Sequence, residues 1–321
     1  MNPMQKIHDR MTSQALLNQT DRHNRQQLTH TDRAISVLLI GDGRHREFRD
    51  SLAVVCCDAT VVRATDVSAA CEMLADGRLA PDIIIVETPR PGQWRTDLLD
   101  KMVSLTPLSR VLLLLGSWCK GEERTGCPWP GGRRIFWYDW LPQWRRELAA
   151  IRANRCPIWG LPMTTTREEL LLNGTSETDP PESIAVAAGL LVVSTRYLET
   201  ADALSDAAQV RGYSTVWART AEAARQIRGA SVAIWEGIDG GAHDVLQIGQ
   251  LRDALGDVPI VAILDFPRVD REEALRVAGV VGMVGKPFQL DDLFARVEQA
   301  AKGAANQPTA RPASSEIGSA A

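Results

Sequence analysis

Two glutamates stand where a functional carboxylate would be expected. Glu87 follows the apolar run 83–86, and Glu236 follows the apolar run 232–235. Lys286 lies 50 residues beyond Glu236. The carboxyl ends of buried parallel strands are where α/β folds place their ligands. We therefore treat the two carboxylates and the lysine as the candidate site residues.

Other patterns of reactive residues are weak. The six cysteines contain no Cys-X-X-Cys pair, and no histidine spacing is typical of a zinc site. The five histidines lie in no Ser/His/Asp arrangement. The segment Gly41-Asp42-Gly43 resembles the start of a dinucleotide fingerprint, but the third glycine is missing. We expect no catalytic residue, no bound metal and no cofactor.

Composition narrows the function classes further. A net charge of −4 gives no electrostatic footprint for nucleic acid. The longest apolar stretch, residues 184–193, is too short to span a membrane, and residues 1–33 lack the apolar core of an export signal. Several cysteines lie in or beside apolar segments, which is typical of core thiols in a reducing compartment. We expect a cytoplasmic protein without nucleic-acid or membrane partners.

Apolar strands and helices alternate twice along the chain. Strands that are apolar without polar alternation indicate parallel sheets buried on both faces. The expected strands are 35–41, 59–63, 81–87, 110–115 and 134–138, and then 189–193, 214–218, 231–236, 259–264 and 280–284. We predict α/β domains over residues 35–155 and 189–302, a linker over 156–188, and disordered segments over 1–33 and 303–321.

The second half resembles the receiver domain of bacterial response regulators. The segment 280–293, Val-Val-Gly-Met-Val-Gly-Lys-Pro-Phe-Gln-Leu-Asp-Asp-Leu, is similar to the family's last strand, Lys-Pro pair and final helix. In the first half, Pro81-Asp82 followed by apolar residues and Glu87 resembles the third strand. The resemblance implies two flavodoxin-like, doubly wound, five-stranded parallel sheets in tandem.

The resemblance also implies a phosphorylation site, which this sequence only partly retains. In the family, two acids after the first strand and an aspartate after the third hold magnesium, while a lysine and a hydroxyl contact the phosphoryl group. Glu87 and Glu236 occupy the phosphoacceptor positions, and Lys286 is the receiver lysine. The other positions are changed. Gly41-Asp42 and Ser194-Thr195 stand in place of the acid pair in the first and second half. Leu115-Gly116 and Leu264-Asp265 stand in the region of the hydroxyl, with Ser117 nearby, and Trp137-Tyr138-Asp139-Trp140 stands in place of the Lys-Pro pair in the first half.

We therefore expect a non-catalytic signalling or interaction protein of the two-component type, built from pseudo-receivers that are not phosphorylated. Its partner would be a histidine kinase, another regulator or a second copy of the chain. One alternative is a phosphorelay protein that uses Lys286 and magnesium, and another is a pseudo-receiver that binds a small molecule. Glu87 and Glu236 are either permanent phosphate surrogates or solvated remnants, and Lys286 is placed to pair with Glu236.

Six of the nine tryptophans lie between residues 118 and 159. Trp137, Trp140 and Trp144 are candidates for an interaction face, because tryptophan is enriched at binding hot spots. The alternative is that these rings pack inside the chain. Glycine, proline and charged residues across 116–132 also predict that the fourth helix is short or missing.

Overall fold

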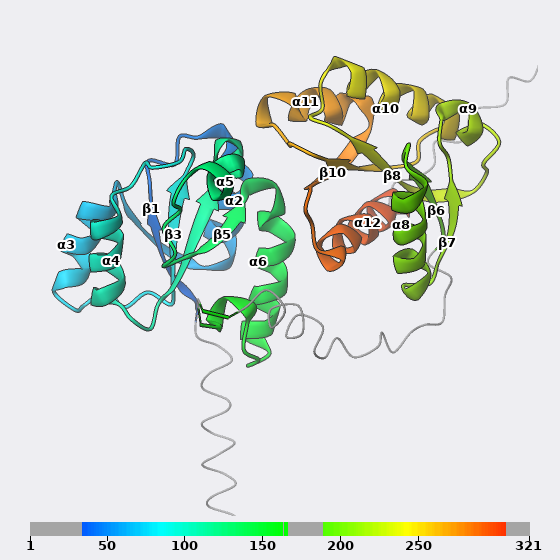
Figure 1. Cartoon of the computed structure of the whole chain (residues 1–321). Helices are drawn as coiled ribbons and strands as arrows, with labels where there is room; N and C mark the ends of the chain where they lie inside the picture. The colour runs from blue at the N-terminus through cyan, green and yellow to red at the C-terminus, as the bar shows by residue number, and fades with distance from the viewer. Residues whose placement is uncertain (1–33, 163, 166–188, 306–321) are drawn as a thin grey trace, which may run out of the picture. The chain divides into compact units, whose positions relative to one another are not determined.

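The computed structural model describes residues 34–162, 164–165 and 189–305. They form two compact units, which divide between Ser176 and Glu177 (Figure 1). The expectations for residues 1–33, for the tail beyond residue 305 and for most of the linker lie outside the described residues. None of the helices in the described part is long and apolar enough to cross a membrane.

The first unit is a five-stranded parallel sheet with the strand order β2-β1-β3-β4-β5. Its strands are β1 (Ser36–Ile40), β2 (Thr60–Ala64), β3 (Ile83–Thr88), β4 (Arg110–Leu115) and β5 (Arg133–Phe136). Its helices are η1 (Arg46–Phe48), α2 (Arg49–Asp58), α3 (Val67–Ala75), α4 (Thr96–Leu105), η2 (Ser117–Gly121), α5 (Glu122–Thr125), α6 (Trp137–Arg152) and η3 (Ile158–Gly160).

The second unit repeats this plan with the order β10-β9-β8-β6-β7. Its strands are β6 (Gly189–Ser194), β7 (Tyr213–Trp217), β8 (Ala230–Gly237), β9 (Ile260–Leu264) and β10 (Val280–Gly285). Its helices are α8 (Leu198–Val210), α9 (Ala221–Ala224), α10 (Ala242–Leu255), α11 (Val269–Ala278) and α12 (Leu290–Ala305). Numbered within each unit, both sheets have the order 2-1-3-4-5, which is the flavodoxin-like order. The predicted fold class is confirmed.

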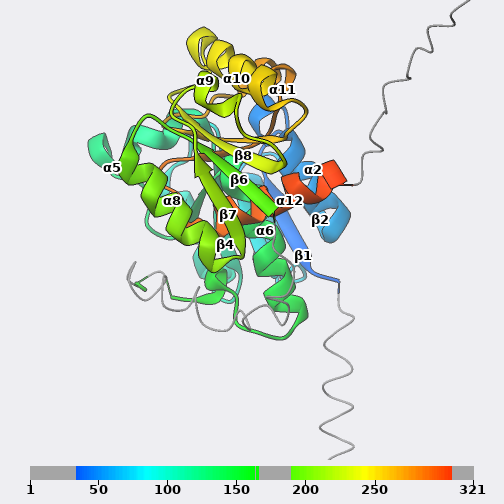
Figure 2. The ribbon, with the colours of Figure 1, turned by 90° about the vertical axis from the view of Figure 1, so that its right-hand side faces the viewer.

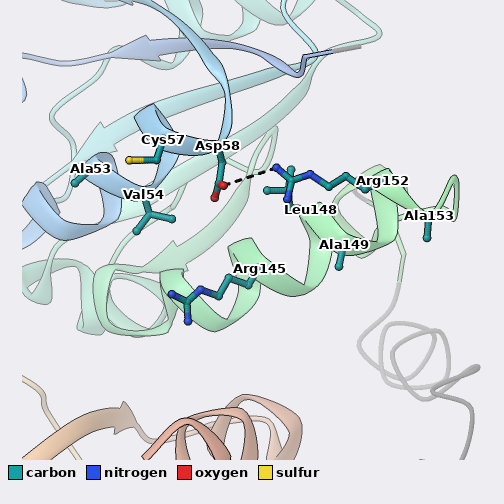
Figure 3. Close-up of a pocket in the computed structure, with 9 residues that line it drawn as sticks. All are labelled: Ala53, Val54, Cys57, Asp58, Arg145, Leu148, Ala149, Arg152 and Ala153. Carbon is teal, nitrogen blue, oxygen red and sulfur yellow. Dashed lines mark ion pairs between the residues drawn. The ribbon is translucent and has the colours of Figure 1, made fainter. Parts of the chain in front are cut away.

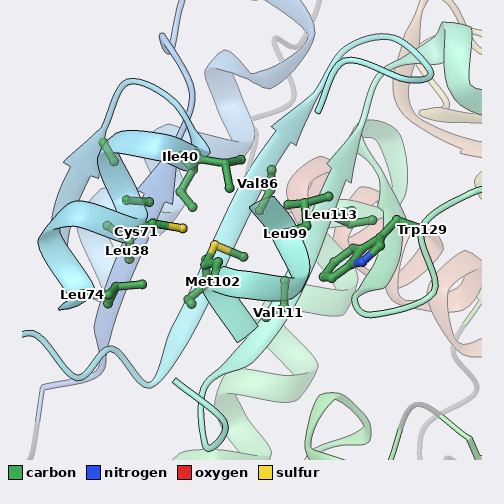
Figure 4. Packing of buried hydrophobic residues seen from close by; sticks show 14 of the residues in the cluster. Leu38, Ile40, Cys71, Leu74, Val86, Leu99, Met102, Val111, Leu113 and Trp129 are labelled. Carbon is green, nitrogen blue, oxygen red and sulfur yellow. The ribbon is translucent and has the colours of Figure 1, made fainter. Parts of the chain in front are cut away.

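Helices cover both faces of each sheet. In the first unit, α3 and α4 pack on one face and bury a core with β1, β3 and β4, part of which Figure 4 shows. In the second unit, α8 and α12 cover one face, and Figures 1 and 2 show α10 and α11 on the other. Every residue of β9 is buried, as expected for a central strand covered from both sides.

The structure differs from the expected elements around Trp137. The last strand of the first unit was predicted to reach Tyr138, but it ends at Phe136, and α6 begins at Trp137 and continues through Pro142. In a helix, Trp137, Trp140 and Trp144 recur at intervals of three and four residues and fall on one buried stripe. Two effects oppose a helix here: aromatic residues favour strands, and Pro142 lacks the N–H for a helical hydrogen bond. Burial of the three large rings outweighs both.

The tryptophans named as a possible interaction face are buried, which corrects that prediction. Trp140 and Trp144 are fully enclosed, and Trp137 is nearly so. Trp140 and Trp144 stack with ring centroids 5.7 Å apart, and Trp159 packs on both. The alternative of internal packing is the one observed. The fourth helix is short, as predicted, with only η2 and the single turn α5 in its place.

Candidate functional site

Glu87 and Glu236 occupy equivalent places in the two units. Each is the penultimate residue of the third strand in its sheet, β3 and β8. In the register, Ile40 pairs with Val86 beside Glu87, and Ser194 pairs with Trp235 beside Glu236. Both carboxylates therefore stand at the carboxyl edge of their sheet, where the first strand also ends.

This register corrects one sequence-based assignment. The pairs Gly41-Asp42 and Ser194-Thr195 were given the same role, but the residue that directly follows the first strand is Gly41 in one unit and Thr195 in the other. Thr195 is thus the counterpart of Gly41, and Arg196 is the counterpart of Asp42. The error was one residue, because continuous apolar strands carry no alternation that would mark the register.

In the second unit, the Glu236 carboxylate is held by two partners. Lys286 Nζ forms an ion pair with Glu236 Oε1, so the predicted pair is confirmed. The Thr195 hydroxyl donates a hydrogen bond to Glu236 Oε2. The Glu236 side chain is only 8% exposed. A buried carboxylate with a cation and a hydroxyl donor is a satisfied anion.

Lys286 is itself shared between two carboxylates. Its ammonium also lies 2.9 Å from Asp265 Oδ1, which extends from the end of β9. Burial alone would lower the pKa of Lys286, but the hydrogen bonds to Glu236 and Asp265 and the charges of both carboxylates outweigh burial and raise it. Lys286 is therefore a charged ammonium that bridges the Glu236 and Asp265 carboxylates.

Backbone contacts fix the surroundings of this carboxylate. The Tyr197 backbone N–H donates to Thr195 Oγ1 at 3.2 Å, and the Trp217 indole donates to the Thr195 carbonyl at 3.0 Å. In the loop after β8, three consecutive backbone N–H groups, at residues 238–240, donate to Asp244 Oδ2 at 2.9–3.0 Å. Asp244 is buried, so it fixes this loop from within.

In the first unit, the equivalent carboxylate forms no ion pair with a described residue. Glu87 is 1% exposed, and its Oε2 accepts a hydrogen bond from the Gly43 N–H at 3.2 Å. Its Oε1 has no hydrogen-bond partner within the described residues. Gly41 leaves the space for this side chain, because a Cβ at Gly41 would lie 2.6–2.8 Å from three Glu87 carbons.

The environment of Glu87 favours its neutral form. Burial raises the pKa of the Glu87 carboxyl, and the nearby charge of Asp42 raises it further. The Gly43 hydrogen bond and the charge of Arg63 act in the opposite direction but do not cancel burial. The two glutamates are equivalent in position yet differ in chemistry, since Glu236 is paired with a cation and Glu87 is not.

Trp137 stands where the lysine would be in the first unit. It directly follows β5, as Lys286 directly follows β10. Its indole N–H donates to the Ser117 hydroxyl at 2.9 Å, and both residues are buried. The hydroxyl that the sequence left as a candidate is therefore engaged by an indole.

Neither arrangement fits the magnesium ion that the family resemblance implies. Both oxygens of Glu236 are occupied, and Thr195 adds no carboxylate. In the first unit, Glu87 is enclosed, and Asp42 is exposed and accepts the Arg44 N–H at 3.0 Å. Magnesium requires oxygen ligands that can arrange themselves octahedrally. Across the described residues 34–162, 164–165 and 189–305, no three His, Cys, Asp or Glu side chains are grouped to hold a metal ion.

Some contacts were beyond sequence-based reasoning. Thr195 was named only as a missing acid, and its hydrogen bond to Glu236 had no signal in the sequence. Asp244 was not singled out at all, although an acid near the start of a helix is a common anchor for backbone N–H groups. The residues of the acid pair in the first unit, Gly41 and Asp42, were found, but only the structure shows that Gly41 makes room for Glu87.

A separate open groove of about 860 Å³ lies between α2 and α6 (Figure 3). It is lined by Ala53, Val54, Cys57, Asp58, Arg145, Leu148, Ala149, Arg152 and Ala153. Asp58 is held by Arg152 at 3.7 Å and by the Trp144 indole at 2.9 Å. None of the candidate site residues named from the sequence lines this groove.

Comparison with known proteins yields structural neighbours only. No protein-family model and no curated protein matches the chain. A response regulator from Thermotoga maritima matches with 22% identity and a TM-score of 0.31, over 35% of this chain and 97% of its own. The receiver domain of Francisella response regulator 1452 matches with 17% identity and a TM-score of 0.31, over 36% and 98%.

A response regulator receiver domain protein from Methanospirillum hungatei matches with 13% identity and a TM-score of 0.31, over 36% of this chain and 93% of its own. These neighbours belong to the family that segment 280–293 resembles. Because these TM-scores are low, the fold is assigned from the strand order, which is the same in both units. The strand order thus confirms the predicted flavodoxin-like fold in each unit.

Proposed function

We propose that the chain is a non-catalytic signalling protein of the two-component type, in which two pseudo-receivers act through contacts with other proteins. The observation that carries this proposal is that both carboxylate oxygens of Glu236 already have partners within the second unit. Lys286 and Thr195 engage both oxygens of the carboxylate that would have to attack a phosphoryl donor.

The physical argument is one of charge balance. A phosphoryl group that approaches a carboxylate must be neutralised by a metal ion and a cation. In the second unit, the Lys286 charge is already balanced by Glu236 and Asp265. In the first unit, Trp137 replaces the cation, and Glu87 is enclosed. Both units keep the scaffold of a receiver while their acceptor sites favour the unmodified state.

Glu236 then acts as a permanent anion bound to Lys286. In such a role, the carboxylate fixes the end of β10 and the loops around it without any modification. Glu87 does not share that role, because its surroundings favour a neutral carboxyl. The proposal therefore assigns the surrogate function to the second unit alone.

The test is to incubate the full chain with a small acyl-phosphate donor and magnesium, and then to measure its intact mass. A receiver domain that is known to accept phosphate serves as the positive control. We expect no gain of a phosphoryl group on the chain. A stoichiometric gain that is lost in Glu236→Gln would refute the proposal and favour phosphotransfer through the second unit.

A magnesium titration gives an independent check. Trp235 is adjacent to Glu236 and reports on this edge of the sheet. We expect no saturable change in fluorescence at millimolar magnesium. A saturable change that disappears in Trp235→Phe would contradict the proposal.

A further inference from the structure

Four arginines at the carboxyl edge of the first sheet are exposed and form no ion pair with any described residue. Arg44 and Arg46 follow β1, Arg63 lies near the end of β2, and Arg90 follows β3. Many other surface arginines are paired with carboxylates, such as Arg78 with Asp76, Arg95 with Asp97, Arg268 with Asp270 and Arg276 with Glu273. We call the four unpaired residues the arginine rim.

Hydrogen bonds hold the loops of the rim in place. The loop after β1 is tied to β3 by the bond from Gly43 N–H to Glu87, and to η2 by the bond from Ser117 N–H to the Glu47 carboxylate at 3.3 Å. Arg63 approaches the same loop, because its Nη1 would lie 3.2 Å from a Cβ built at Gly43. These bonds fix the backbone that carries Arg44 and Arg46, and the Arg63 side chain lies near the same loop.

Trp118 adds an exposed aromatic ring to this edge. It is the second residue of η2, between the buried Ser117 and Cys119, and it is 66% exposed. The other tryptophans described in the first unit are buried or half-buried. An exposed tryptophan at the same sheet edge as four arginines without ion pairs has the composition of a binding hot spot, in which Trp and Arg are enriched.

Carboxylates of the chain do not neutralise the rim. Glu47 turns inward to Ser117, and Asp66 caps α3 by accepting the Ala69 N–H at 2.9 Å. Asp42 is exposed and its charge acts on Glu87, but among the described residues it forms no ion pair with an arginine of the rim. The corresponding edge of the second unit differs, because Lys286 is paired there and Arg196 contacts His243 at 3.1 Å.

We propose that the arginine rim and Trp118 bind an acidic segment of a partner protein. Guanidinium groups bind carboxylates through paired, charge-assisted hydrogen bonds, and the indole supplies apolar contact area. A net charge of −4 gives the chain no overall attraction for a long polyanion, whereas a short acidic segment needs only the local charge of the rim. The inference rests on the proposed function, because it names the chemistry of the protein partner which that function requires.

The test uses fluorescein-labelled oligo-glutamate as the probe and oligo-glutamine of equal length as its neutral control. Fluorescence anisotropy with the full chain should show saturable binding of oligo-glutamate that weakens as salt is added. Arg44→Glu/Arg90→Glu should weaken binding at least about tenfold, since like charges now face the probe. Trp118→Ala should weaken it as well.

The matched control is Arg78→Glu/Arg276→Glu, which changes the net charge equally at two exposed arginines outside the rim. It should leave binding within about twofold of wild type, because screening limits charges at a distance. If a charge-reversal variant melts early, Arg44→Gln/Arg90→Gln provides the same test with less perturbation.

Three outcomes would overturn the inference: no saturable binding, equal losses in rim and control variants, or tighter binding of single-stranded DNA than of oligo-glutamate. Phosphorylation of Glu236 in the mass experiment would refute the proposed function without changing this binding result. The two failures can therefore be told apart.

Discussion

Gly41 and Glu87 are packed so closely that a Cβ at Gly41 would lie 2.6 Å from Glu87 Cδ. Gly41 also has φ of 143°, which side-chain-bearing residues rarely adopt. We expect Gly41→Ala to destabilise the first unit by about 1–3 kcal/mol, because both strain and overpacking act at this position. Chemical denaturation of the full chain measures the effect.

A double-mutant cycle separates the two causes. Glu87→Ala removes Cγ and Cδ, two of the three clashing carbons, so part of the Gly41→Ala cost should be recovered in the double variant. Additive costs would show that Cγ and Cδ of Glu87 do not contribute, which leaves backbone strain and the Cβ at position 87 as the causes.

The raised pKa of Glu87 predicts a pH dependence of stability. The folded-state pKa lies above the unfolded value, so the folded chain holds the proton more tightly. Its contribution to stability is complete below the unfolded pKa and is lost as pH rises through the folded pKa. Glu87→Gln should therefore reduce the fall in stability over that range, and should be neutral or stabilising above it.

Melting temperatures measured from mildly acidic to neutral pH check this prediction. Glu236→Gln is the matched control at the equivalent position, and it should not mimic the Glu87 result. A Glu87→Gln variant that is less stable than wild type at neutral pH would show that Glu87 is ionised and needed.

The Lys286–Glu236 pair predicts strong coupling between its members. Lys286→Met leaves a carboxylate that is 8% exposed without its cation, and should cost about 1–3 kcal/mol. This figure is below that of a fully buried pair, because Lys286 is 31% exposed. Hydrogen exchange of peptides from β8 and β10 measures the loss in the second unit.

The double variant Lys286→Met/Glu236→Gln should cost less than the sum of the two single changes. Asp265→Asn is a useful comparison, since Asp265 contacts the same ammonium but is 53% exposed. It should cost no more than about 1 kcal/mol. Equal costs for Asp265 and Glu236 variants would argue against Glu236 as the principal anion.

The stack of Trp140, Trp144 and Trp159 predicts that the first unit needs residues beyond α6. Trp159 is 6% exposed, and its backbone N–H donates to the Glu147 carboxylate at 3.4 Å. Trp159→Ala should cost about 3–5 kcal/mol, as expected for removal of a buried aromatic ring. Denaturation followed by tryptophan fluorescence measures it.

Trp118→Ala is the control for this change. Its ring is exposed, so the substitution should alter stability by no more than about 0.5 kcal/mol. If Trp159→Ala changes the free energy of unfolding as little as Trp118→Ala does, packing of Trp159 on the α6 rings does not stabilise the first unit.

Much of the fold could be read from the sequence because its central strands are buried on both faces. Runs such as 83–86, 111–115 and 260–264 are apolar throughout, which is typical of a parallel sheet covered by helices on both faces. The prediction was wrong at Trp137, where the packing of three rings on one helix face replaced the expected end of a strand.

The sequence by itself determined the tandem flavodoxin-like plan, the positions of Glu87 and Glu236, and the pairing of Lys286 with Glu236. Only the tertiary structure decided that the two glutamates differ. That difference depends on which residue follows the first strand beside each carboxylate, Gly41 or Thr195, and on whether a cation follows the last strand. Uniformly apolar strands do not specify the register between the first and third strands of each sheet. The contacts of Glu87 and Glu236 join residues more than forty positions apart, so they depend on how the strands align in space.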